Sequence, residues 1–173
     1  MLNLSAVLEQ HMRRKPEAEA LVCGDRRLTY AQLDAWANQI ANALAASGIR
    51  RGDHVALLCP NLPYFPAVYF GILKTGAAVV PLNVLLKPRE IAYHLRDSDA
   101  KAMFCFQGTA ELKMAEAAKA AVAVVPACKA LIVLPHPSIP LDPAFDEGQD
   151  VIPLARFIAG QPLRNVVDKR SWF

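Results

Sequence analysis

Residues 71–83 read GILKTGAAVVPLN, and this stretch joins the end of a helix directly to an apolar strand. The residues before it, 63–75, place apolar side chains at helical spacing between Pro63 and Gly76. Proline at a helix start and glycine just past its end are typical of helix termini. Residues 77–82 are continuously apolar, which favours a strand buried on both faces. The stretch therefore predicts a helix that ends at Gly76 and leads into a covered sheet.

The same alternation of apolar runs and helices extends to both sides. Further strands are predicted at 54–59, 101–106 and 130–134, and further helices at 88–97 and 109–121. Short apolar strands that alternate with helices are typical of a parallel sheet with both faces covered. The expected fold class is α/β: a layered parallel sheet with helices on both faces.

The N-terminal residues predict helices and a hairpin. Residues 2–15 have the apolar spacing of an amphipathic helix, and residues 20–29 predict a hairpin that turns at Gly24-Asp25. Thr29 and Gln32 form a capping-box pattern for a helix that stops at Gly48.

After Leu134 the regular pattern gives way to a proline-rich loop. Residues 151–159 predict one more helix, and residues 161–173 show no clear element. We therefore expect an α/β subdomain over residues 1–134, followed over 135–173 by a loop, a short helix and an irregular tail. A chain of 173 residues is long enough to bury a core of its own.

Composition narrows the class of protein. The chain is 54% hydrophobic, but every apolar run is broken by proline, glycine or charge, so no membrane span is expected. The N-terminus lacks the features of a signal peptide, and we expect a cytoplasmic protein. The net charge of +3 comes from scattered basic pairs, which argues against nucleic-acid binding.

The sequence predicts no catalytic set and no metal site. Four cysteines lie far apart without paired spacing, and we expect buried, reduced thiols. Gly71 and Gly76 have the outer spacing of a Walker loop, but Ala77-Ala78 stand where that loop carries Lys-Ser/Thr. Gly71 is therefore interpreted as a helix residue and Gly76 as a helix cap.

Two segments, and an ordered series around them, carry a family resemblance. The two segments are residues 28–33 (LTYAQL) and 73–83 (LKTGAAVVPLN). Shorter matches lie between and after them in the order expected for the family: 52–56 (GDHVA), 60–61 (PN), 90–98 (EIAYHLRDS) and 100–101 (AK). The segments resemble the first two signatures of the adenylate-forming acyl-CoA synthetases, and the resemblance covers about residues 4–134. Pro81-Leu82-Asn83 is more similar to fatty-acid and other acyl-CoA ligases than to peptide-synthetase domains.

This resemblance implies a two-step ligase that uses ATP, Mg²⁺ and CoA. ATP and a carboxylate, here a medium- or long-chain fatty acid, would give an acyl-adenylate and pyrophosphate, and the CoA thiol would then displace AMP. In the family a Ser/Thr/Gly-rich phosphate loop and a C-terminal lysine carry the chemistry, and neither motif is found in residues 1–173. We therefore expect the N-terminal fragment of a ligase, inactive alone. A natural truncation, a frameshift and a cut sequence remain equally open.

The resemblance also suggests four residues that would face CoA: Asn83, Lys87, Arg89 and Lys113. Positive charge at these positions suits CoA phosphates, although ordinary solvated lysines explain Lys87 and Lys113 as well.

Two other functions remain open. The first alternative is a non-enzymatic module that pairs with a full-length ligase or with a separately encoded remainder. The second is an unrelated flavodoxin-like binder. For a ligase fragment we also expect self-association, because part of its apolar surface would lie open.

Overall fold

The structure is a computed structural model that describes residues 3–141, 145 and 151–167. The chain separates into two compact units. The first unit contains residues 1–52, 61–78 and 160–173, and the second contains 53–60 and 79–159. The chain thus passes from the first unit to the second and back twice.

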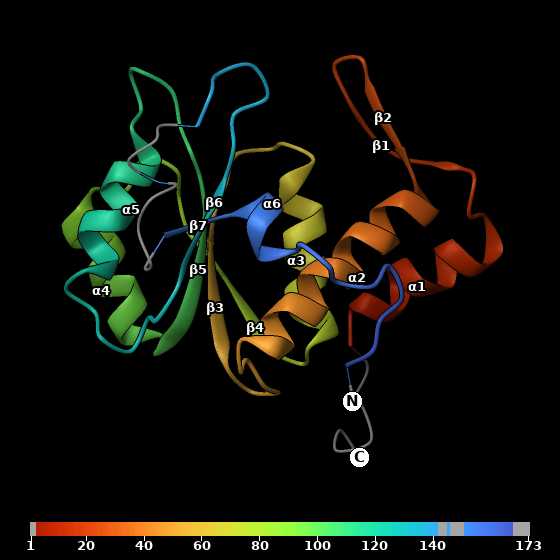
Figure 1. Ribbon diagram of the computed structural model, residues 1–173, viewed down its shortest axis with the longest axis horizontal. Coiled ribbons are helices and arrows are strands. Elements are labelled where there is room, and N and C mark those ends of the chain that lie inside the picture. Colours follow the sequence, from red (N-terminus) through yellow and green to blue (C-terminus); the bar gives the residue numbers. More distant parts are fainter. Residues whose placement is uncertain (1–2, 142–144, 146–150, 168–173) are drawn as a thin grey trace. The chain divides into compact units, whose positions relative to one another are not determined.

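A five-stranded sheet forms the second unit (Figure 1). Its strands are β3 (His54–Leu58), β4 (Ala78–Pro81), β5 (Ala100–Phe106), β6 (Leu131–Leu134) and β7 (Val151–Pro153), in the spatial order β4-β3-β5-β6-β7. The pairs β3–β5, β5–β6 and β6–β7 are parallel. The side chains of β6 and all but the first of β3 are buried, as expected for strands covered on both sides.

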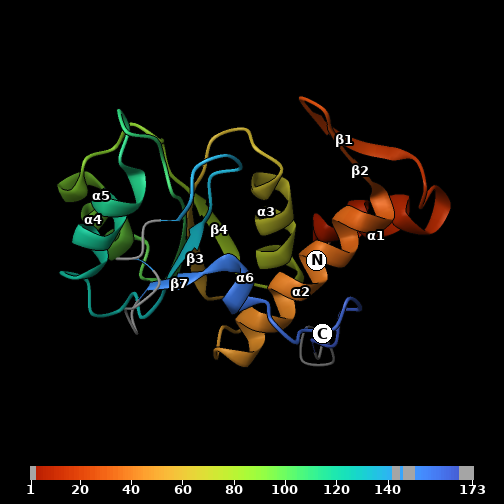
Figure 2. The same cartoon turned by 45° about the horizontal axis from the view of Figure 1, so that its top comes forward.

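Helices cover both faces of this sheet. Helices α4 (Pro88–Asp97) and α5 (Met114–Val122) pack together on one face, and the short helix α6 (Leu154–Phe157) lies on the other (Figures 1 and 2). Phe157 of α6 meets the fully buried Phe104 of β5 edge to face, with ring centroids 5.7 Å apart. The predicted layered α/β fold is confirmed.

The first unit is mainly helical. It contains α1 (Ser5–Arg14), the antiparallel hairpin β1 (Glu19–Cys23) and β2 (Arg26–Thr29), α2 (Tyr30–Ala46) and α3 (Tyr64–Lys74). The capping box is confirmed: the Gln32 N–H donates to Thr29 Oγ1 at 3.2 Å, and the Thr29 N–H donates to Gln32 Oε1 at 2.9 Å. The hairpin turns at Gly24-Asp25, also as predicted.

Helices α2 and α3 approach closely because Gly71 carries no side chain. A Cβ atom at Gly71 would lie only 2.7 Å from Ile40 Cγ2 and 3.1 Å from the Ala37 carbonyl oxygen. Trp36 and Tyr64 meet edge to face in the same helix pair, with ring centroids 5.4 Å apart. Gly71 is therefore a packing residue within a helix, as expected.

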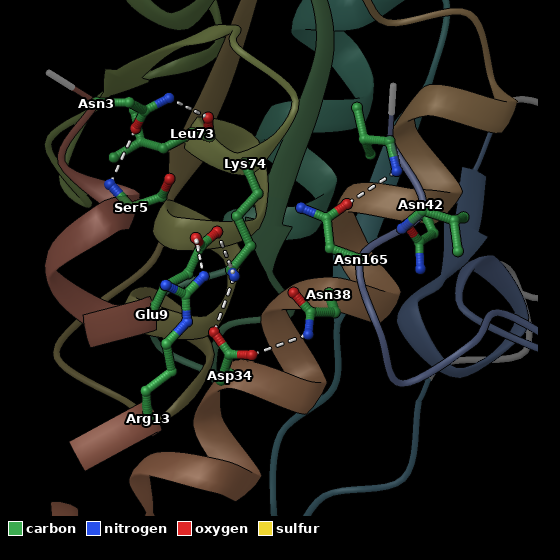
Figure 3. A network of polar contacts seen from close by, with 12 residues as sticks. Asn3, Ser5, Glu9, Arg13, Asp34, Asn38, Asn42, Leu73, Lys74 and Asn165 are labelled. Atoms are coloured by element: carbon green, nitrogen blue, oxygen red, sulfur yellow. Dashed lines mark hydrogen bonds and ion pairs between the residues drawn. The ribbon is translucent and has the colours of Figure 1, made fainter. Parts of the chain in front are cut away.

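A buried lysine joins the three helices of the first unit (Figure 3). Lys74, with a side chain only 1% exposed, places Nζ 2.8 Å from Asp34 Oδ1 of α2 and 3.2 Å from Glu9 Oε1 of α1. Asp34 also accepts a hydrogen bond from Asn38 Nδ2 at 2.9 Å. The sequence motif contains Lys74, but its spacing did not predict this burial.

The structure corrects two helix predictions. Helix α5 begins at Met114 and not at Thr109, because residues 107–113 form a loop in which the Thr109 N–H bonds the Leu112 carbonyl. Residues 151–159 are not one helix: Val151–Pro153 pair with β6 as strand β7, and only Leu154–Phe157 are helical. In so short a segment, pairing with a neighbouring strand overrides the helical spacing.

All four cysteines are free thiols, as predicted, and three of them are buried. Cys23 is only half-buried, contrary to the prediction, because it lies in the two-stranded β1–β2 sheet, where no residue of β1 is fully buried. No helix in the described part of the chain is both long and apolar enough to cross a bilayer.

We predict that Gly76→Val lowers the free energy of unfolding by about 1 kcal/mol or more. Gly76 has a φ of 82° just after α3, and its N–H bonds the Leu73 carbonyl, so the predicted cap is present. A β-branched residue is strained in this left-handed conformation, whereas asparagine tolerates it. Urea denaturation measures the change. Gly76→Asn is the matched control and should cost clearly less; equal midpoints for the wild type and the valine variant would contradict the prediction.

Candidate functional site

The candidate site lies in the second unit, at the edge of the sheet formed by the carboxyl-terminal ends of its strands. The loop of residues 82–87 follows β4, the loop 107–113 follows β5, and residues 135–141 follow β6. Strands that run parallel bring such loops to one edge, which is where open parallel sheets usually bind their ligands. Strand β3 lies between β4 and β5, so the first two loops flank it.

The four residues suggested by the family resemblance all belong to these loops or to the helix starts that follow them. Asn83 and Lys87 lie in the loop after β4, Arg89 is in the first turn of α4, and Lys113 immediately precedes α5. All four are exposed. The structure therefore places them at one edge of the sheet, on two loops separated by the width of β3.

Asn83 and Lys87 each have a local structural role. Asn83 Oδ1 accepts the Leu85 N–H at 2.9 Å, which closes a turn directly after β4. The Lys87 N–H donates to Glu90 Oε2 at 2.7 Å, so the acidic side chain satisfies the start of α4. Both bonds hold the loop in shape and leave the Lys87 ammonium exposed.

Lys113 lies at the rim of a cleft of about 260 Å³. The remaining wall of the cleft comes from the loop after β5, the first turn of α5 and the segment after β6: Gln107, Gly108, Thr109, Ala110, Glu116, Ile139, Pro140 and Phe145. Lys113 Nζ is 3.1 Å from Glu116 Oε1, and both side chains are more than half exposed. Such a solvated pair is weak, and a phosphate can compete with it.

Gln107 joins two of the loops that form the cleft. Its Nε2 donates to the Pro140 carbonyl at 2.9 Å, and its Oε1 accepts the His136 N–H at 3.0 Å. No sequence pattern indicates this role, because both partners are backbone groups of the segment that follows β6. Gln107 is thus a positioning residue that sequence patterns do not reveal.

Gly108 keeps the loop after β5 tight. It has a φ of 95°, and a Cβ atom there would lie 2.7 Å from the Met114 N–H nitrogen and still closer to the Leu112 carbonyl oxygen. In the same loop, a backbone hydrogen bond and, after it, the hydrogen bond from the Thr109 hydroxyl lower the pKa of Glu111. The loop therefore carries a carboxylate together with the ammonium of Lys113.

No thiol near this edge is an activated nucleophile. Burial raises the pKa of Cys59, directly after β3, to about 12. Burial, together with the charge of Cys59, raises the pKa of Cys105 in β5 well above its usual value. Within residues 3–141, 145 and 151–167 there is also no group of three His, Cys, Asp or Glu side chains that could hold a metal ion. The exposed ammonium and guanidinium groups suit phosphate oxygens.

The fold is that of known CoA ligases. The structure superposes on the crystal structure of the anthranilate CoA ligase AuaEII in complex with anthranoyl-AMP with a TM-score of 0.78. The sequences are 28% identical, and the match covers 94% of this chain and 28% of that one.

The sequence profile of the AMP-binding enzyme family matches residues 8–156, and the chain belongs to this family. It is 42% identical over 103 residues to the long-chain-fatty-acid–CoA ligase FadD13 of Mycobacterium tuberculosis, covering 58% of this chain and 20% of that enzyme. It is 41% identical over 88 residues to the 3-hydroxybenzoate–CoA/4-hydroxybenzoate–CoA ligase of Thauera aromatica, and this match covers 51% of this chain and 17% of that enzyme. The chain thus spans about a fifth of the length of these relatives. Family membership sets aside the flavodoxin-like alternative.

Proposed function

We propose that this chain forms the N-terminal part of an ATP-dependent acid–CoA ligase whose substrate is a medium- or long-chain fatty acid. The observation that carries the proposal is the family match over residues 8–156, on a fold that superposes on a CoA ligase over 94% of the chain. In the proposed reaction the carboxylate attacks the α-phosphorus of ATP and releases pyrophosphate. The CoA thiol then attacks the acyl carbonyl and releases AMP.

A fatty acid is the preferred substrate because a long-chain-fatty-acid–CoA ligase stands among the relatives and because the Pro81-Leu82-Asn83 segment is similar to those of acyl-CoA ligases. An aromatic acid is the competing substrate, since hydroxybenzoate ligases match with nearly the same identity. Fatty-acid metabolism in the cytoplasm is the setting that we propose for the whole enzyme.

The role we propose for the loops after β4 and β5 is to bind CoA. Lys87, Arg89 and Lys113 would offer their charges to its phosphate groups, and Asn83 would shape the first loop. Mg²⁺ would neutralise the ATP phosphates, but the described residues offer no carboxylate cluster for it. Metal binding is therefore not proposed for this chain.

We predict that the chain by itself catalyses no exchange of pyrophosphate into ATP with palmitate, because residues 1–173 contain no Ser/Thr/Gly-rich phosphate loop. A chimera of FadD13 in which this chain replaces the matched segment should form palmitoyl-CoA. Unmodified FadD13 is the positive control, and 3-hydroxybenzoate is the alternative substrate.

Three results would count against these proposals. Palmitate-dependent exchange by the chain alone would show that it carries its own phosphate site. A folded chimera that binds ATP but forms no acyl-CoA would favour the non-enzymatic module, which pairs with a ligase without serving as part of it. Preference for 3-hydroxybenzoate would overturn the fatty-acid assignment alone.

The proposed CoA site makes a separate prediction. Replacing Lys87, Arg89 and Lys113 together by alanine should weaken CoA binding at least about tenfold, because each charge-assisted bond to phosphate contributes more than a neutral one. Isothermal titration calorimetry measures the affinity. Lys129→Ala is the matched control, since Lys129 is an exposed lysine of the same unit that precedes β6 at the opposite edge of the sheet. Equal affinities, or no CoA binding by the wild type, would contradict the site.

We also propose that the chain associates with itself. Apolar side chains such as Val22 (51% exposed) and Leu85 (66% exposed) support this, as do the two edges of the two-stranded β1–β2 sheet, which offer main-chain groups to another chain. The prediction is that light scattering detects dimers or larger species that increase with protein concentration and that bind a hydrophobic dye. A monomer at every concentration, with no dye binding, would contradict it.

A further inference from the structure

The C-terminal segment of residues 161–167 runs along α2 and is held there by amide side chains. Gln39 Nε2 donates to the Gln161 carbonyl at 3.2 Å, and Asn38 Nδ2 donates to the Leu163 carbonyl at 2.8 Å. Both amides come from one helix, and both partners are peptide groups.

Asn42 makes the largest share of these bonds. Its Nδ2 donates to the carbonyl oxygens of Pro162 and Arg164, at 3.0 and 2.9 Å. Its Oδ1 accepts the Val166 N–H at 3.0 Å. Both hydrogens of one amide, and its oxygen, are thus used to bind main chain.

The side chains of the segment take little part in this binding. Leu163 is 62% exposed and Val166 is 56% exposed, although both are apolar, and Arg164 is also exposed. Asn38 and Asn42, by contrast, are only 5% and 3% exposed. The helix therefore recognises the path of the main chain and not the identity of the residues that follow it.

Two features limit how firmly the segment is held. Asn38 Oδ1 and Asn165 Nδ2 are buried without a hydrogen-bond partner in the described part of the chain. Such unsatisfied polar atoms cost free energy, so the net free energy gained when the segment binds to α2 is smaller. Gly160, at the start of the segment, has a φ of 72° and open space around it. Glycine adopts positive and negative φ about equally readily, so this position can change its backbone angles at little conformational cost.

We propose that Asn38, Gln39 and Asn42 form a main-chain clasp on α2, from which residues 161–167 can be released while α2 stays folded. The clasp holds this segment through its main-chain carbonyls and the Val166 N–H. Asn38 also bonds Asp34, which pairs with Lys74. Seating of the segment is therefore connected to the buried ion pair of the first unit.

Trypsin tests the clasp at a bond that it covers. Asn42 binds the carbonyl of Arg164, so the peptide bond after Arg164 should be cut slowly in the wild type although the arginine side chain is exposed. Asn42→Ala should raise the cleavage rate at this bond, and hydrogen exchange at the Val166 amide, at least about tenfold, the change expected for losing one or more net hydrogen bonds.

A pair of variants on the segment separates main-chain from side-chain recognition and leaves the core of α2 untouched. Val166→Pro removes the N–H that Asn42 accepts and should speed cleavage after Arg164 as Asn42→Ala does. Leu163→Ala combined with Val166→Ala removes two apolar side chains and should leave cleavage at the wild-type rate. Gln39→Ala, which loses one bond at the end of the segment, should have a smaller effect than Asn42→Ala.

Helix content by circular dichroism is followed in every variant, because the proposal requires that α2 survive release of the segment. Fast cleavage in the double alanine variant would show that side chains hold the segment and would overturn the proposal. It would equally be overturned if Val166→Pro left cleavage and exchange unchanged, or if release of the segment unfolded α2.

Discussion

The first unit depends on a single buried ammonium group. Lys74 ends α3, and its Nζ lies 2.8 Å from a carboxylate oxygen of α2 and 3.2 Å from one of α1. Burying an unpaired charge is costly, so the ion pair forms only when all three helices are in place. The C-terminal end of a helix also favours a positive charge. A neutral side chain of similar shape could pack there as well, but it would not specify which two helices must meet α3.

The helices and strands of this chain could largely be predicted because their ends carry local signals. Thr29 with Gln32 starts α2, Pro88 starts α4 and Gly76 ends α3, and each of these signals acts within a few residues. Strand β7 could not be predicted in this way. Its three residues are extended because β6 lies beside them, and that neighbour is distant in sequence. The same reason hides the role of Lys74, whose partners lie on other helices.

Part of the candidate site could be predicted from the sequence and part could not, for the same reason. The order of the apolar runs predicts a parallel sheet, and with it a site where the strands end. The resemblance to the family suggested Asn83, Lys87, Arg89 and Lys113 as its residues. Gln107 could not be found, because its side chain bonds backbone groups of the segment after β6. A sequence shows which side chains can bond, but it does not show which main-chain groups will lie within reach. The amides of α2 that hold residues 161–167 illustrate the same limit.

The position of β3 within the sheet has a consequence for the order in which the protein can form. Strand β3 lies between β4 and β5, and both of these come later in the chain. The last four residues of β3 are buried in the folded protein, so during synthesis this strand must wait for two partner strands. Until β5 has left the ribosome, one whole edge of β3 and most of its apolar surface remain available to other chains. Assembly of the sheet around β3 is thus delayed until its central strand, β5, exists. The interval between the synthesis of β3 and that of β5 is therefore the period in which this chain is most exposed to aggregation and to chaperones.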